Sequence, residues 1–237
     1  MQAWQTVGID THEIDLAQIR RLREPISRIT TSVETRSVSA PRAPAKNRQG
    51  IERRIMSMVF TDATGFSKIK ENSAPNYLEY FLGEVRRLID SAEAEPAFVN
   101  TWGDGLYVVF SSVVDTGRFC LELRDMVNDK VWGMLGLPEN NNVRIALLTG
   151  PVFSRVDPVI NITNFFGMHV NTAARIEPSV VPGAVYVIEQ AASCIRAAGR
   201  EDIYCEMLCT VPLAKEFGDQ SLYVVQWAKG HDSRLVA

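Results

Sequence analysis

Two aspartates, at positions 62 and 104, follow short apolar stretches and stand close to glycines. Asp62 ends the apolar run that begins at Met58, and Asp104 lies in the turn sequence Trp102-Gly103-Asp104-Gly105. If the strands that lead to them are neighbours, both carboxylates emerge at one edge of a sheet. Such a pair can hold two Mg²⁺ or Mn²⁺ ions, the arrangement used for in-line displacement at phosphorus. Taken alone, each aspartate is more often a simple turn former.

The turn that follows Asp62 has a composition suited to phosphate binding. It reads Ala63-Thr64-Gly65-Phe66 and leads into a helical pattern. The backbone N–H groups of a tight glycine turn can hold phosphate oxygens while the nearby carboxylate holds a cation. We therefore expect phosphate-binding contacts from Thr64, Gly65 and Phe66.

A third motif carries an amide and a guanidinium. Asn171 and Arg175 lie four residues apart in a predicted helix, so both project from one helical face. Together they suit a pentavalent phosphate, whose charge must be met in the transition state. An ordinary polar helix face explains this segment equally well when it is considered in isolation.

The elements that must position these residues begin after residue 50, where strand and helix patterns alternate. Apolar and β-branched stretches predict strands at 54–61, 143–149, 152–155, 184–188, 203–210 and 221–225, and a hairpin at 98–110 that turns at Gly103. A turn is expected at Gly150-Pro151. Helical spacing predicts helices at 76–92, 115–134, 167–177 and 189–198. Hairpins and crossovers are mixed, which favours an α+β domain with a largely antiparallel sheet covered by helices.

The first 50 residues differ in composition from the rest. Residues 11–26 carry apolar side chains at helical spacing, and residues 30–49 are rich in Ser, Thr, Arg, Ala and Pro. We expect an N-terminal helix and flexible linker over 1–50 and a folded domain over 51–237, with the helix packing on that domain or on a second copy of the chain. The segment is basic, but it contains no nucleic-acid-binding motif, so no nucleic-acid partner is expected.

Composition limits the classes of protein that remain. The 237 residues are 46% hydrophobic and 22% charged, as in an ordinary globular chain. No apolar run approaches the length of a membrane span, and the N-terminus does not resemble a secretory signal. The four cysteines have no metal-ligand or disulfide-framework spacing. We expect a cytoplasmic protein with no direct membrane insertion.

In combination, these segments resemble the catalytic domain of class III nucleotidyl cyclases, the adenylate and guanylate cyclase family. The resemblance covers about residues 54–227 and is carried by five blocks in the order of the family, at 59–66, 100–105, 143–152, 166–175 and 182–187. It implies a ferredoxin-like α+β fold. It also implies a nucleoside triphosphate substrate, two divalent cations (Mn²⁺ or Mg²⁺), and a homodimer whose active sites lie at the subunit interface.

The resemblance assigns roles residue by residue. Asp62 and Asp104, with Ala63 beside them, would bind the metal ions. Asn171 would orient the ribose, and Arg175 would stabilise the α-phosphate. Lys215 falls where the family keeps a lysine for the terminal phosphates, although Glu216 follows it where a glycine is usual. One chain would supply the aspartates of a site and its partner would supply Asn171 and Arg175.

Two positions that read the purine base in the family depart from its pattern. Asn100 replaces the lysine of adenylate cyclases or the glutamate of guanylate cyclases, and Asn164 replaces the aspartate, threonine or cysteine. Trp102 and Phe165 add bulk nearby, although both rings are also explained as core residues. We expect Asn100, Trp102, Asn164 and Phe165 to read the base.

A small cyclase domain without the purine code resembles the pyrimidine cyclases of bacterial anti-phage defence. That resemblance implies a pyrimidine triphosphate substrate, cyclic UMP or cyclic CMP as the product, and a separate effector protein that senses it. The Asn100 and Asn164 amides each offer a donor and an acceptor that match the pairing edge of uracil, so we expect UTP and cyclic UMP. Three alternatives remain open at this point: a cytidylate cyclase, a purine cyclase with unusual base readers, and a catalytically silent domain that binds a nucleotide or only dimerises. A diguanylate cyclase is disfavoured because the hairpin lacks that family's signature.

Overall fold

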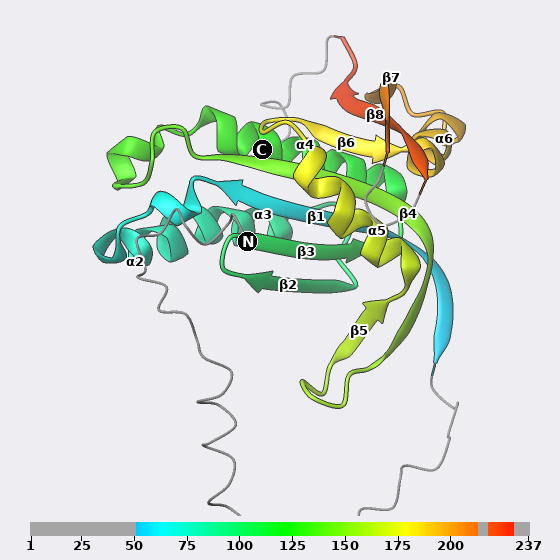
Figure 1. The fold of residues 1–237 in the computed structure, drawn as a ribbon, viewed down its shortest axis with the longest axis horizontal. Coiled ribbons are helices and arrows are strands. Elements are labelled where there is room, and N and C mark those ends of the chain that lie inside the picture. Colours follow the sequence, from blue (N-terminus) through cyan, green and yellow to red (C-terminus); the bar gives the residue numbers. More distant parts are fainter. Residues whose placement is uncertain (1–50, 213–217, 230–237) are drawn as a thin grey trace, which may run out of the picture. The chain divides into compact units, whose positions relative to one another are not determined.

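The structure, a computed structural model, describes residues 51–212 and 218–229 (Figure 1). The predicted N-terminal helix and linker lie outside the described residues, as does Lys215. The proposed domain boundary near residue 50 therefore stays a prediction.

One sheet forms the centre of the described domain. Its strand order is β2-β3-β1-β4-β6-β8-β7, and β5 pairs with the far end of β4. Only the β4–β6 pair is parallel. The strands are β1 (Glu52–Thr64), β2 (Phe98–Trp102), β3 (Gly105–Phe110), β4 (Asn142–Val156), β5 (Thr163–Phe166), β6 (Val185–Ile188), β7 (Ile203–Pro212) and β8 (Asp219–Trp227).

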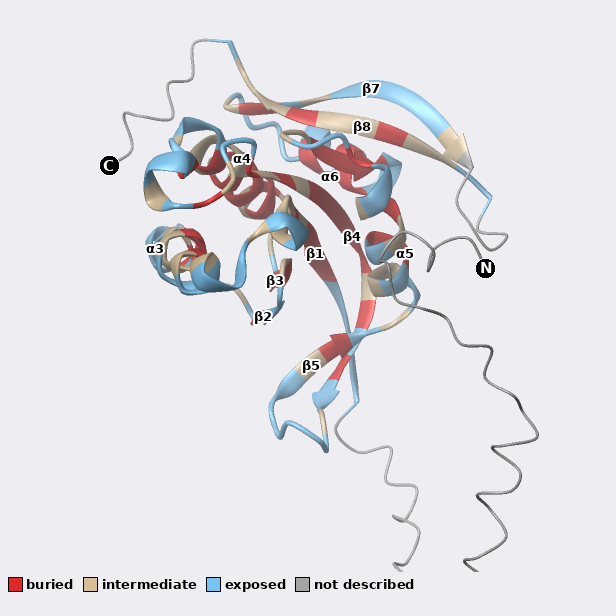
Figure 2. Cartoon of the chain, turned by 60° about the vertical axis from the view of Figure 1, so that its left-hand side comes forward, coloured by how far each residue is buried: buried red, intermediate tan, exposed pale blue. Residues whose placement is uncertain are grey.

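The helices divide unequally between the two faces of the sheet (Figures 1 and 2). One face packs on α3 (Gly83–Ser91), α4 (Val113–Asp129) and α6 (Glu189–Ala197), and the other on α5 (Met168–Ile176). A continuous helical segment, formed by α2 (Ala74–Asn76) and a π-helical turn (Tyr77–Leu82), precedes α3. Short 3-10 helices lie at Phe66–Lys68, Glu71–Ser73, Trp132–Leu135 and Glu177–Ser179.

Alternation along the central strands creates two separate cores. In β1, Val59 faces the helices α3, α4 and α6, whereas Met58 and Phe60 face α5. Successive strand side chains point to opposite faces, so one strand supplies both cores. The sheet is therefore buried on both sides through its middle, where the hydroxyls of Ser57 and Thr149 hydrogen-bond to each other at 2.9 Å.

The predicted turn at Gly150-Pro151 is wrong, because β4 runs unbroken through both residues. Gly150 pairs with Met56 and Pro151 with Ile55 of β1. A Cβ built on Gly150 would lie 2.2 Å from the Cδ2 atom of His169 in α5. The glycine marks the close approach of a helix to the strand backbone and not a chain reversal.

The remaining predicted elements are present with shifted ends. The predicted helix at 115–134 ends at Asp129 and is followed by a separate 3-10 turn, and β5 was not predicted at all. The predicted α+β class with a largely antiparallel sheet is confirmed. Within residues 51–212 and 218–229, no helix is long and apolar enough to cross a membrane.

Candidate active site

The end of β1 and the turn between β2 and β3 meet at one edge of the sheet. Asp62 pairs with Gly105 in the ladder between β1 and β3. The backbone N–H of Ala63 donates to the carbonyl oxygen of Asp104 at 3.0 Å. This bond ties the turn to the strand end, and the structure brings the two predicted metal-binding aspartates together.

The electrostatics of this edge show how closely the two carboxyls approach. Burial raises the pKa of Asp62, and the charge of Asp104 and a side-chain hydrogen bond between the two carboxyls raise it further. Burial also raises the pKa of the nearby Tyr77 hydroxyl, and the charges of Asp104 and Asp62 add to this effect. The Asp104 carboxylate thus disfavours ionisation of Asp62, and a bound cation would offset this effect.

Sequence reasoning missed two charged residues at the same edge, Arg144 on β4 and Glu177 at the end of α5. Arg144 is the ladder partner of Asp62, and its Nη1 atom donates to Asp62 Oδ2 at 2.9 Å. The same Nη1 atom lies 3.8 Å from Glu177 Oε1. An arginine within the apolar strand sequence Val143-Arg144-Ile145 was the available signal, but Glu177 gave none.

Glu177 is held in an unfavourable environment for a carboxylate. Burial, and then the charges of Asp62 and Asp104, raise its pKa to about 7, and Arg144 offsets only part of this. Its Oε1 atom is buried and has no hydrogen-bond partner among the described residues. The carboxyl groups of Asp62 and Glu177 therefore flank the Arg144 guanidinium, and Asp104 lies close to both acids.

The donor set fits hard divalent cations. The Asp62 and Asp104 carboxylates, with the carbonyl of Ala63 as a further oxygen, are of the type that Mg²⁺ and Mn²⁺ prefer. In the described part of the chain, no group of three or more His, Cys, Asp or Glu side chains is arranged to hold a metal ion. The site therefore offers few side-chain ligands, which suits ions that also bind substrate phosphates.

The turn after Asp62 has the backbone shape that sequence reasoning required of it. Gly65 adopts φ 95°, in the left-handed region that favours glycine, and its carbonyl accepts from the Lys68 backbone N–H at 2.9 Å. The Phe66 ring packs edge-on against Tyr77, with ring centroids 4.8 Å apart. Thr64, Gly65 and Phe66 thus lie directly beside the aspartates.

Helix α5 carries Asn171 in its second turn and Arg175 one turn later. Asn171 is exposed, whereas Arg175 is half-buried. The helix ends next to the aspartates, since Glu177 follows it and approaches Arg144. The roles of Asn171 and Arg175 stay predictions, and α5 is the element that would have to deliver both.

The four predicted base readers fall into two environments. Asn100 is exposed on β2, and Trp102, which is 48% exposed, lies over Gly105 with its ring 6.1 Å from that of Phe60. Phe165 is only 5% exposed and packs on Phe98, so within one chain it is a core residue, and its base-reading role stays a prediction.

Asn164 is engaged by local contacts. Its Oδ1 atom accepts from the Phe165 backbone N–H at 2.7 Å, and its Nδ2 atom donates to Asp157 at 3.4 Å. Because adjacent strand residues point to opposite faces, Asn164 and Phe165 cannot both face the α5 side, where the Phe165 ring packs. The structure therefore groups Asn100 with Trp102 and leaves Asn164 apart.

Comparison with known proteins assigns the family. The sequence model described as "Adenylate and Guanylate cyclase catalytic domain" matches residues 52–226. The chain belongs to this family. It is therefore a class III nucleotidyl cyclase domain, and the matched span contains Asp62, Asp104, Asn171 and Arg175.

Individual relatives agree with this assignment. Mouse guanylate cyclase 2G is 28% identical over 192 residues, which cover 75% of this chain and 16% of the mouse protein. The adenylyl cyclase CyaB from P. aeruginosa superimposes with a TM-score of 0.65 at 16% identity, covering 74% of this chain and 95% of that one. The guanylate cyclase domain of RhGC from Catenaria anguillulae, solved with GTP, gives 0.64 at 20% identity, with 75% and 100% coverage. The two superpositions establish the cyclase fold.

Proposed function

We propose that this cyclase domain converts a ribonucleoside triphosphate to its 3′,5′-cyclic monophosphate and pyrophosphate. The observation that carries the proposal is the convergence of Asp62 and Asp104 at one sheet edge, tied by the bond from Ala63 to Asp104. A silent domain that only binds or dimerises would have no need to place a second carboxyl beside Asp62, where it raises the pKa of Asp62.

The chemistry divides between the ions and the chain. Asp62 and Asp104 would hold two divalent cations, which when bound would supply the Lewis acidity that favours loss of the ribose 3′-hydroxyl proton and offsets charge on the phosphates. The backbone of Thr64, Gly65 and Phe66 binds phosphate oxygens beside the ions. Arg175 meets the charge that develops on the α-phosphate, and Asn171 orients the ribose. Lys215 is assigned to the terminal phosphates.

We further propose that the sites are shared between two chains of a homodimer. In support, large apolar side chains are exposed where β5 pairs with β4 and at the start of α5. They are Phe153 of β4, Phe166 of β5 and Met168 of α5. Exposed apolar surface of this kind is typical of association sites. Asn171, exposed on α5, would then reach the aspartates of the partner.

A complementation experiment tests the shared site. Asp104→Ala and Arg175→Ala chains are each expected to be inactive, and their mixture is expected to recover about a quarter of wild-type activity, because half of a random mixture is heterodimer with one intact site of two. Heterodimers verified by two affinity tags that show no recovery would place each site within a single chain.

For the base, we propose a pyrimidine, with UTP preferred over CTP. Asn100 offers a donor and an acceptor at an exposed position, as the pairing edge of uracil requires, and the Trp102 indole narrows the space beside it. An extra purine ring would cost about 1 to 3 kcal/mol of overpacking. Asn164 contributes only if its bonds to Phe165 and Asp157 open.

Competition among equimolar ATP, GTP, CTP and UTP with Mn²⁺ tests the base, with products separated by chromatography. Cyclic UMP is the expected main product, and Asn100→Ala should reduce the preference by about ten- to a hundredfold. Asn140→Ala, at an exposed position before β4, is the matched control. Cyclic CMP as the main product would reject only the uracil preference. Cyclic AMP or cyclic GMP as the main product would reject the pyrimidine proposal. No product from any nucleotide would favour the catalytically silent domain.

We assign the product to signalling in the cytoplasm, in anti-phage defence, through a separate effector protein. The support is the absence of both purine codes at Asn100 and Asn164, as in the pyrimidine cyclases that the chain resembles. Cells that carry the natural locus should lose protection against phage when Asp62 is changed to alanine. Protection that persists in this variant would reject the assignment.

A further inference from the structure

Arg144 has two carboxylate partners and uses only one of them. Its Nη1 atom donates to Asp62 Oδ2 at 2.9 Å, whereas Glu177 Oε1 lies 3.8 Å from the same nitrogen, beyond hydrogen-bonding distance. Glu177 Oε1 is buried and has no hydrogen-bond partner among the described residues. A shift of about 1 Å by the guanidinium would complete that bond.

The cost of this arrangement falls on Glu177. Its side chain is 15% exposed, and a buried carboxylate without a hydrogen bond is expensive to keep. Glu177 Oε1 is therefore a second acceptor to which the Arg144 guanidinium can donate. Arg144, 33% exposed, has the freedom to use it.

A cation on Asp62 would change the balance between the two positions. In the structure, Arg144 neutralises Asp62, a carboxylate that the proposed function assigns to metal binding. A divalent cation at Asp62 would repel the guanidinium and take its hydrogen-bond acceptor. In the part of the chain that the structure describes, Glu177 is the carboxylate besides Asp62 that forms an ion pair with Arg144, at 3.8 Å.

We propose that Glu177 is a positioning residue that receives Arg144 when Asp62 binds a divalent cation. The inference rests on the metal-binding role of Asp62 in the proposed function. In this arrangement Arg144 is an internal counterion that competes with metal, and Glu177 lowers the cost of displacing it. Glu177 itself does not ligate the ion.

Mn²⁺ affinity, measured on the full-length protein by the electron paramagnetic resonance signal of free Mn²⁺, tests the proposal without nucleotide or turnover. Arg144→Met should bind Mn²⁺ about three- to tenfold more tightly, because the competing cation is gone. Glu177→Gln should bind it about three- to tenfold more weakly, because Arg144 then stays on Asp62. In the Arg144→Met background, Glu177→Gln should change the affinity by less than about twofold.

Controls separate this role from a structural one. Glu189→Gln removes an acid on α6 that pairs with Arg196 and should leave Mn²⁺ affinity unchanged. Arg144→Gln provides a second removal of the guanidinium if Arg144→Met does not fold. A crystal structure with Mn²⁺ should show Arg144 within hydrogen-bonding distance of Glu177 and withdrawn from Asp62.

The outcomes distinguish the inference from the function beneath it. An equal loss of affinity from Glu177→Gln with and without Arg144 would make Glu177 a direct ligand and overturn the proposal, while the metal site would stand. An unchanged Mn²⁺ affinity in the single variant Glu177→Gln would also overturn the proposed role of Glu177, and the metal site would again stand. No Mn²⁺ binding in any variant would overturn both the inference and the two-metal function.

Discussion

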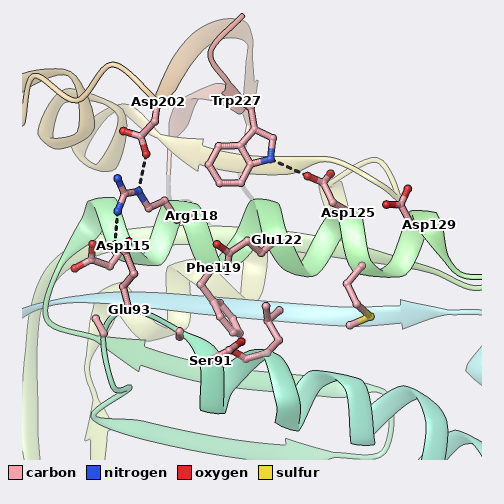
Figure 3. A pocket seen from close by; sticks show the side chains of 14 residues that line it. Ser91, Glu93, Asp115, Arg118, Phe119, Glu122, Asp125, Asp129, Asp202 and Trp227 are labelled. Atoms are coloured by element: carbon pink, nitrogen blue, oxygen red, sulfur yellow. Dashed lines mark hydrogen bonds and ion pairs between the residues drawn. The ribbon is translucent and has the colours of Figure 1, made fainter. Parts of the chain in front are cut away.

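Carboxylates gather near arginines in two regions of this domain, and the two regions differ in geometry. At the sheet edge, Asp62 and Glu177 flank Arg144, and Asp104 lies close to both acids. On the side of the sheet that α3, α4 and α6 cover, Arg118 of α4 lines a cavity of about 400 Å³ (Figure 3). The acidic residues that line this cavity are Glu93, Asp115, Glu122, Asp125, Asp129 and Asp202.

The cavity acids are distributed along a surface, and several have partners from other elements. Arg118 donates from Nε to Asp202 at 2.6 Å and also bonds to Glu93 (Figure 3). Burial lowers the pKa of Arg118, but hydrogen bonding to Asp202 and the charges of Asp202 and Glu93 outweigh it, and the net shift is upward. Trp227 donates from Nε1 to Asp125 at 2.7 Å. These contacts join α4 to the segments around β7 and β8.

The sheet-edge acids come from three elements, β1, the β2–β3 turn and the end of α5. The backbone bond from Ala63 to Asp104 holds two of them together. The close pairing of Asp62 with Asp104, and not the number of acids, therefore distinguishes the candidate metal site from the acidic cavity.

The largest effect expected from this comparison is on turnover. Asp62→Asn and Asp104→Asn should each reduce cyclase activity by at least about 10²- to 10³-fold, because each removes an ionic metal ligand. The fold should survive, since each change relieves like-charge repulsion. Glu122→Gln and Asp129→Asn in the cavity are the matched controls and should stay within about twofold of wild type. Chromatography of the cyclic product measures all four, and equal losses in both regions would erase the distinction.

Stability should show the reverse pattern. Arg118→Met should lower the free energy of unfolding by about 2 to 3 kcal/mol, because Asp202, 19% exposed, loses its shorter charged hydrogen bond and keeps only the one from Arg200 at 3.3 Å. Arg86→Met, which breaks the exposed pair with Asp90, should cost less than about 1 kcal/mol. Urea unfolding followed by circular dichroism gives both values. An Arg118 variant as stable as the Arg86 variant would show that the cavity contacts do not hold the fold.

A smaller effect should appear in the pH dependence of stability without divalent cations. The folded-state pKa of Glu177 is about 7, above its ordinary value of 4.5. Below pH 4.5 the Glu177 carboxyl is protonated in both the folded and the unfolded chain. Between pH 4.5 and about 7 the unfolded chain loses this proton, whereas the folded chain keeps it. Wild-type stability should therefore fall toward neutral pH by about 1 to 2 kcal/mol relative to Glu177→Gln.

Urea unfolding at pH values below, within and above this window measures the difference between wild type and Glu177→Gln. Glu206→Gln, at an exposed position on β7, is the control. A difference that stays constant across the window would mean that Glu177 ionises as easily in the folded chain as in the unfolded one.

The sequence predicted the parts of the site that local patterns encode. Asp62 and Asp104 follow β-branched and apolar strands, and the hairpin glycines mark the turn between β2 and β3, so their meeting at one edge followed from strand pairing. Asn171 and Arg175 were placed on one helix by their spacing. Local periodicity also sufficed for most strands of the sheet.

Long-range contacts were beyond such patterns. Gly150-Pro151 has the composition of a turn, and only the packing of α5 on the strand explains the glycine. Glu177 lies 33 residues from Arg144 along the chain, and the proximity of their side chains depends on where α5 ends. Likewise, the core position of Phe165 follows from the unpredicted strand β5 and its pairing with β4.

The contact between His169 and Gly150 also limits how far α5 can shift relative to β4. The imidazole occupies the space in which any other residue at position 150 would place its Cβ, so α5 rests directly on the main chain of β4. Interiors packed this closely transmit displacement instead of absorbing it. An alanine at position 150 would therefore displace α5 from β4. Asn171 and Arg175 would move together with the helix, whereas the strand ends that carry Asp62 and Asp104 would stay in place.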